Sequence, residues 1–298
     1  SRSHAGQRSG SVIAVGTASR RKDAVPLGAD HVTVIDRYPF AAHSRSDAQQ
    51  MASDAHPSLR DPRTHIRAVG GAFVVVALVV LLASVAVALG VPLLDAAGIA
   101  RGSALRLALR SAFQFVGFGV AGVGFLLVTD RIDFVPVRWP TRGDLKWFGV
   151  GFAGLLGLYV IATTLFGALG VSGAESAIVE QGADQPVYFL LLIPVTILLV
   201  GPTEELIFRG IVQGLFREAY GTPVAIAAAS AVFAAVHVSS YSGEGLLATL
   251  AVVLLLGGVL GVVYEKCGNL VVPAAIHGLF NTVQFAVAYA AATGLVGS

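Results

Sequence analysis

Seven long stretches of this chain are almost free of charged residues, and this feature restricts the fold more than any other. A stretch of about 20 apolar residues is long enough to cross the hydrocarbon core of a bilayer as a helix. Only 13% of the 298 residues are charged, against about 25% in soluble domains. The sequence therefore predicts an all-α, polytopic transmembrane helix bundle. The predicted spans cover residues 69–92, 106–129, 147–170, 186–217, 222–240, 245–264 and 270–296.

Two places in this pattern leave room for an eighth segment. The last apolar stretch is long enough to be broken at Gly294, and residues 91–100 are apolar enough to lie along the membrane interface. We therefore expect seven spans and keep eight open.

Charged residues in the connecting loops predict the orientation of the spans, because Lys and Arg accumulate in cytoplasmic loops. Basic residues precede the first span, lie between the second and third, and follow the fourth and the sixth. The alternate loops 171–185 and 241–244 carry acidic residues without a base, and Arg101, followed by Arg106 and Arg110, is the exception. The sequence predicts a multi-pass protein of the cell membrane, with a cytoplasmic N-terminus and the C-terminus outside.

Residues 1–66 differ in composition from residues 67–298. They mix Ser, Arg, Asp, His and Gly without a period and contain no apolar stretch that could serve as a signal segment. We expect a polar, disordered extension ahead of the transmembrane domain. The single methionine, Met51, lies shortly before the first span, so we expect native translation to start there; a genuine soluble tail is the alternative.

Charge content argues against one class of partner, and cysteine content excludes two kinds of structural site. No run of Lys and Arg is dense enough to form a nucleic-acid groove, so nucleic acid is not an expected partner. The chain has one cysteine, Cys267, which rules out an internal disulfide and a metal cluster built from cysteines.

Ionisable side chains inside the predicted spans are candidates for function, because each costs at least about 2.5–3.5 kcal/mol to insert. The fourth span reads VGPTEELIFRGIVQGLF and places Glu204, Glu205 and Arg209 in apolar surroundings. The last two histidines of the chain, His237 and His277, also lie within predicted spans. Such groups need either a partner or a task.

The depths of these side chains are compatible with a single site. Asn281 follows His277 by four residues and therefore shares its helical face. Counted from the cytoplasmic helix ends, Glu204 and His237 each lie roughly 22 Å deep, at 1.5 Å per residue. His277 and Asn281 lie roughly 12 and 18 Å deep by the same count. All four side chains can meet at middle depth.

Glu205 and Arg209 are spaced i, i+4 and are expected to pair, which leaves Glu204 without a local partner. A carboxylate in apolar surroundings holds a proton more readily than one in water, which suits a general base that works near neutral pH. A purely structural reading stays open. The Glu205–Arg209 pair could serve packing, and His277 with Asn281 could form a hydrogen-bonded clip between helices.

Three motifs in this region resemble those of a known family. The residues EELIFR, which start at Glu204, resemble the EExxxR motif of the CPBP intramembrane proteases, a family that includes the Ras-converting CAAX endopeptidase. FAAVH, which ends at His237, resembles the FxxxH element of that family, and HGLFN, which ends at Asn281, resembles its HxxxN element. Each motif alone is weakly specific. The ordered set covers roughly residues 186–285.

The resemblance implies an enzyme, an intramembrane endopeptidase that hydrolyses peptide bonds of membrane-anchored or transmembrane substrates. The reaction would be CAAX-type processing of prenylated proteins or a related peptide maturation. Glu204 and His237 would activate a water for attack on the scissile carbonyl. His277 and Asn281 would stabilise the oxyanion, while the second glutamate and the arginine of the first motif would hold the site in shape or position the substrate.

Two alternatives remain at this stage. Glu204, His237 and His277 make a His₂Glu set like that of some zinc hydrolases, although the chain contains no HExxH pair. We favour no cofactor and keep zinc as the alternative. Mid-membrane Glu, His and Arg also occur in transporters, and an inactive relative could act as a membrane scaffold. The absence of a convincing internal repeat and the complete motif set favour the protease.

Overall fold

The computed structural model describes residues 62–295, all of which belong to one compact unit. Seven helical segments are long and apolar enough to cross a membrane, which confirms the predicted multi-pass helix bundle. The predicted polar extension and Met51 lie almost wholly outside the described residues. The segments are α2 (Pro62–Ala96), α3 (Ala104–Val128), α4 (Arg142–Leu169), the composite span Val187–Tyr220, α9 with its following turn (Thr222–Ser240), α10 (Leu246–Cys267) and α11 (Val271–Ala292).

Within residues 62–295, neither candidate for an eighth segment forms a separate membrane-spanning helix. Helix α2 continues through Pro92 to Ala96 and so takes up much of the stretch expected at the interface. Helix α11 ends at Ala292, and Gly294 beyond it has a left-handed backbone with φ of 72°. At the other end, α2 begins at Pro62, ahead of the expected boundary at residue 67. Proline fits the first turn of a helix because its missing N–H is not needed there.

The composite fourth span is an α-helix interrupted by two π-helical segments. It consists of α6 (Val187–Val195), the π-helical segment η3 (Thr196–Val200), α7 (Gly201–Glu205), the π-helical segment η4 (Leu206–Val212) and α8 (Gln213–Tyr220). Pro202 has no N–H to donate to the preceding turn, so the regular helical hydrogen bonding is interrupted there. Single π-turns are often found at functional sites. Here they flank the two glutamates.

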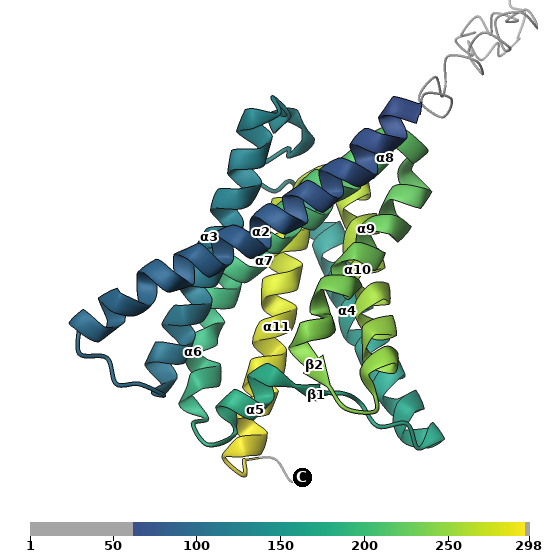
Figure 1. Ribbon diagram of the computed structural model, residues 1–298. Helices are drawn as coiled ribbons and strands as arrows, with labels where there is room; N and C mark the ends of the chain where they lie inside the picture. The colour runs from purple at the N-terminus through teal and green to yellow at the C-terminus, as the bar shows by residue number, and fades with distance from the viewer. Residues whose placement is uncertain (1–61, 296–298) are drawn as a thin grey trace, which may run out of the picture. The chain divides into compact units, whose positions relative to one another are not determined.

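Two loops pair at one end of the bundle, which the sequence did not indicate. Strand β1 (Glu175–Ser176) precedes α5 (Ala177–Ala183), and strand β2 (Tyr241–Ser242) follows the 3₁₀ turn η5 (His237–Ser240). The strands are antiparallel, with Glu175 opposite Ser242. Figure 1 shows both strands and α5 at the same end as the close of α11.

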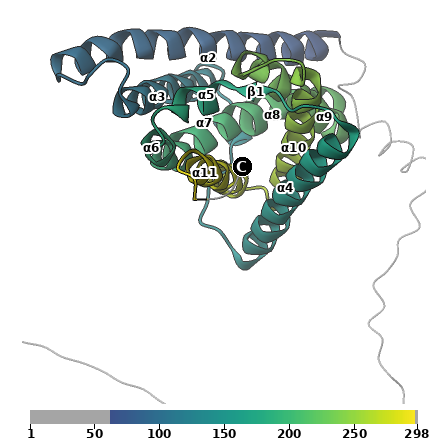
Figure 2. The same cartoon turned by 90° about the horizontal axis from the view of Figure 1, so that it is seen from below.

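Helix α11 is the centre of the arrangement. It contacts α4, α10 and the segments α6, η3 and α7 of the composite span. Seen from below, α11 is viewed nearly end-on between α6 and α4, while α2 runs along one edge of the bundle (Figure 2). Two apolar clusters hold the bundle together, and the second of them includes residues of α11. One is centred on Ile207, Ile211 and Phe233, and the other on Leu260 and Ile276.

Candidate active site

Two glycines bring the composite span against α11 at very short range. A Cβ atom added to Gly201 would lie 2.6 Å from the carbonyl oxygen of Ala274, and one added to Gly278 would lie 3.1 Å from the Cα of Ile197. The two backbones therefore nearly touch. This contact sets the positions of Glu204, which follows on α7, and of His277 on α11.

Both glutamates of the first motif meet His277 in the protein interior. The Nδ1 atom of His277 is 2.9 Å from Oε1 of Glu205, and its Nε2 atom is 3.7 Å from Oε2 of Glu204. All three side chains are buried. The sequence predicted that Glu204 has no partner on its own helix; the structure supplies one from α11.

The expected ion pair between Glu205 and Arg209 is present. The Nε atom of Arg209 donates to Oε2 of Glu205 over 3.0 Å, and both side chains are fully buried. The guanidinium also lies 5.0 Å from the centroid of the Phe233 ring, a favourable cation–π distance. With both carboxylates ionised, this cluster is electrically neutral when His277 carries a proton. Glu205 thus has two partners, Arg209 and His277.

His237 is oriented by the backbone of its own helix. Its Nδ1 atom lies 2.7 Å from the carbonyl oxygen of Phe233. Because a carbonyl oxygen only accepts, Nδ1 must be the donor, and in the neutral ring Nε2 is then free to accept a proton. The ring packs 4.4 Å from that of Phe233, which also lies edge-on to His277 at 6.0 Å. His237 lies at the end of α9, where the 3₁₀ turn begins.

Asn281 is oriented by a residue that the motifs do not contain. Its Nδ2 atom donates to Oγ1 of Thr196 over 3.2 Å. Thr196 is buried at the start of the first π-helical segment. An amide nitrogen has two hydrogens, so one remains for another acceptor.

A cavity of about 1050 Å³ joins these groups. Glu204, His237, His277 and Asn281 all line it. The structure therefore places the four predicted catalytic side chains on the wall of one cavity, and Glu205 and Arg209 lie outside its lining. Aromatic side chains form much of the remaining wall, among them Phe115, Phe166 and Phe280.

Tyr241 is a further polar group of this wall that motif reasoning missed. Burial raises the pKa of its hydroxyl, and the nearby Tyr159 and Glu204 add to this shift. The hydroxyl therefore stays protonated and can donate a hydrogen bond. Its position directly after the FxxxH element and the 3₁₀ turn was the available signal.

The zinc alternative makes a demand on the geometry of the described side chains. A catalytic zinc site needs three protein ligands about 2 Å from one point. Between residues 62 and 295, no group of three or more His, Cys, Asp or Glu side chains is placed to hold a metal ion.

The glycine contact gives a prediction about the geometry of the site. Replacing Gly201 with Ala should force α7 and α11 apart, because its Cβ would overlap the Ala274 carbonyl. We expect overpacking to cost about 1–3 kcal/mol and cleavage to fall although no polar group is removed. Gly258→Ala is the matched control, since its Cβ would meet no atom within 4 Å. Unfolding in detergent and peptide cleavage measure both effects, and equal behaviour of the two variants would contradict the account.

Known proteins are similar to the part of the chain that carries these side chains. Residues 186–283 match the family model described as type II CAAX prenyl endopeptidase Rce1-like. An uncharacterized 24.3 kDa protein of Escherichia coli is 30% identical over 148 residues, which are 47% of this chain and 66% of that protein. The uncharacterized protein YpbD of Bacillus subtilis is 28% identical over 171 residues, which are 56% of this chain and 80% of that protein. No solved structure matches the chain.

The family match confirms the resemblance seen in the three motifs. It covers the composite span, α9, α10 and the part of α11 that carries His277 and Asn281. Residues 186–283 of this chain thus match the Rce1-like type II CAAX prenyl endopeptidase family, as the three motifs indicated.

Proposed function

We propose that this protein is an intramembrane endopeptidase that cleaves membrane-anchored or transmembrane peptide substrates by attack of a water molecule. The observation that carries the proposal is the pairing of Glu204 with His277 at 3.7 Å on a cavity wall that His237 and Asn281 share. A buried carboxylate beside imidazole and amide groups has the composition that peptide hydrolysis requires.

In the first step Glu204 acts as general base. It takes a proton from water while the water oxygen bonds to the scissile carbonyl carbon. His237 orients this water or shares its proton through Nε2, which the Phe233 carbonyl leaves free. A well-placed general base contributes about 10²–10⁴-fold in rate. Glu205 cannot replace it, because Arg209 and His277 already occupy its oxygens.

In the second step the carbonyl oxygen becomes an oxyanion that needs hydrogen-bond donors. Asn281 supplies the amide hydrogen that Thr196 does not use, and protonated His277 supplies its Nε2–H. One such donor is worth about 2.7–4 kcal/mol in an oxyanion hole. The tetrahedral intermediate then collapses, the C–N bond breaks, and Glu204 returns its proton to the leaving amine.

We propose a multi-pass location with the N-terminus in the cytoplasm, which rests on the Lys and Arg content of the loops. The lipid bilayer is the constant partner, and the substrates are membrane proteins or peptides. The family description favours either CAAX-type processing or a related peptide maturation.

We further propose that catalysis needs no metal. The support is that the described His and Glu side chains do not converge as a zinc site requires. Cleavage of a quenched membrane-peptide library by purified protein should therefore be unchanged by a strong chelator. Loss of cleavage on chelation, with recovery on adding zinc, would make Glu204, His237 and His277 metal ligands and contradict this part of the proposal.

A further inference from the structure

Part of the wall of the cavity that holds Glu204 lies at one end of the bundle. Its lining includes Glu175 and Ser176 of β1, Ser239 and Ser240 of the 3₁₀ turn, and Tyr241 of β2. Glu175 and Ser239 are exposed to solvent. The cavity therefore runs from Glu204 to the end of the bundle that carries the paired loops. Figure 1 shows that α11 ends at the same end of the bundle.

The opposite end is covered by the segment between α3 and α4. Its 3₁₀ turn η2 (Ile132–Phe134) presses the Phe134 ring to within 2.6 Å of a Cβ position on Gly214, and Val135 packs in the same way on Gly210. Tyr264 donates its hydroxyl hydrogen to the Phe134 carbonyl over 2.7 Å. This segment thus packs directly on the part of the composite span that follows Glu204.

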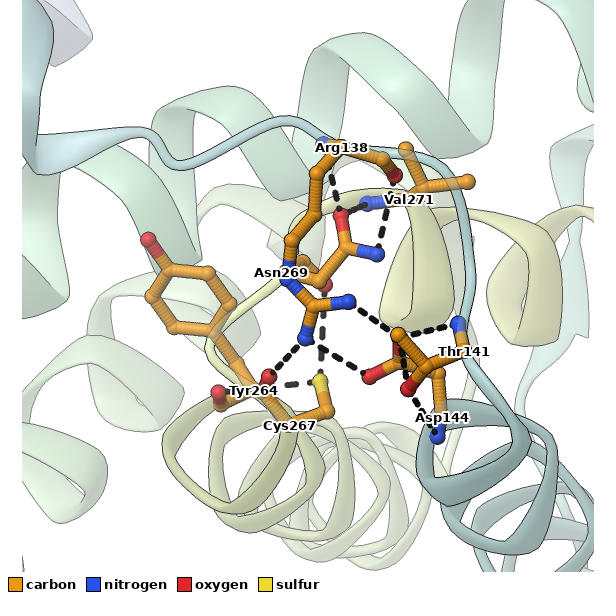
Figure 3. A network of polar contacts seen from close by, with 7 residues as sticks. All are labelled: Arg138, Thr141, Asp144, Tyr264, Cys267, Asn269 and Val271. Atoms are coloured by element: carbon orange, nitrogen blue, oxygen red, sulfur yellow. Dashed lines mark hydrogen bonds and ion pairs between the residues drawn. The ribbon is translucent and has the colours of Figure 1, made fainter. Parts of the chain in front are cut away.

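A polar network fastens the same segment to the turn between α10 and α11 (Figure 3). The Arg138 guanidinium donates to both carboxylate oxygens of Asp144 and to the carbonyl of Cys267. The side chain of Asn269 accepts a hydrogen bond from the backbone N–H of Arg138 and donates one to the backbone carbonyl of the same residue. Both backbone polar groups of Arg138 therefore have a partner. Asn269 is fully buried. These hydrogen bonds hold the segment between α3 and α4 in place at this end of the bundle.

The two ends differ in basic charge. Eight Lys and Arg side chains of residues 62–295 lie at the covered end: Arg63, Arg67, Arg131, Arg138, Arg142, Lys146, Arg217 and Lys266. The end where the cavity opens has three: Arg101, Arg106 and Arg110. Since cytoplasmic ends are enriched in Lys and Arg, the covered end is the cytoplasmic one.

We infer that substrates reach Glu204 from the non-cytoplasmic side of the membrane. The inference rests on the proposed function and narrows its substrate class. The substrate is an extracytoplasmic peptide segment of a secreted or membrane protein, rather than a prenylated tail held on the cytoplasmic leaflet. A cavity with an aromatic wall and a polar mouth suits a segment that leaves the membrane surface to enter the bundle.

Cysteine labelling tests the side of the opening without any need for enzyme activity. In a Cys267→Ser background, Ser242→Cys places a thiol in β2 beside the mouth, and Gly143→Cys places one at the start of α4. Both positions are exposed. A membrane-impermeant maleimide added to intact cells should label Ser242→Cys, and it should label Gly143→Cys only after the cells are permeabilised. The reverse pattern would overturn the inference.

A second readout links the opening to the reaction. A long maleimide-polyethylene glycol attached to Ser242→Cys should abolish most cleavage of the quenched peptide library, and the same label on Gly143→Cys should leave cleavage unchanged. Blocking from Gly143→Cys alone would overturn the access route. If unlabelled, folded protein cleaves neither the library nor native membrane proteins, the proposed protease function fails, and the labelling still decides which side the cavity faces.

Discussion

Glu204→Gln should lower kcat/KM for peptide cleavage by about 10²–10⁴-fold, the range that general base catalysis contributes. Glutamine has nearly the same volume and still accepts a hydrogen bond, but it cannot take a proton from water. Because the side chain lines the cavity and lies 3.7 Å from His277, beyond hydrogen-bonding distance, we expect little change in the unfolding temperature in detergent. Cleavage assays on purified variant and wild type measure the effect.

Glu218→Gln is the matched control for this substitution. Glu218 is exposed near the covered end and pairs with Arg131 at 2.6 Å, well away from the cavity lining. An exposed ion pair of this kind contributes about 0–1 kcal/mol, so both cleavage and folding should match wild type. Full activity in Glu204→Gln, or an equal loss in Glu218→Gln, would contradict the assigned role.

Arg209→Met should cause the largest loss of stability, about 3–5 kcal/mol, because breaking a buried ion pair leaves the other charge unpaired. Arg209 and Glu205 are both fully buried, and the arginine carries the nearest positive charge to the carboxylate besides His277. Unfolding in detergent measures the loss. The double variant Glu205→Gln with Arg209→Met should be more stable than Arg209→Met alone, since no lone carboxylate remains.

Arg217→Met provides the comparison on the same span. Arg217 bonds Glu265 over 3.1 Å, but its side chain is 38% exposed, so water can replace the partner. We expect a loss of no more than about 1 kcal/mol. Equal losses at positions 209 and 217 would show that the Glu205–Arg209 pair is not the support that holds the motif.

The sequence predicted the spans well because apolar length is a local property. Seven helices stand where seven apolar stretches were found. The ends differ where a local signal competes with length: Pro62 starts α2 early, and α11 ends before Gly294. The β1–β2 pairing could not be predicted, because each strand is two residues long and carries no alternation to detect.

The site was predictable only in part, because some of its contacts depend on packing between segments that are far apart in the sequence. Helical spacing indicated the Glu205–Arg209 pair, and motif order indicated which side chains gather. The contacts of His277 with both glutamates depend on the close approach at Gly201 and Gly278, which joins residues far apart in the sequence. The π-helical segments, and with them the placement of Thr196 beside Asn281, likewise follow from packing.

The most direct test of the central claim is the detection of cleavage products in oxygen-18 water. Purified wild type would be incubated with the membrane-peptide library and with native membranes, and new peptide ends would be identified by mass spectrometry. We predict products that carry solvent oxygen-18 in the new carboxylate and that are missing when Glu204 is glutamine. A folded wild type that yields no such product from either source would contradict the assignment as an intramembrane endopeptidase.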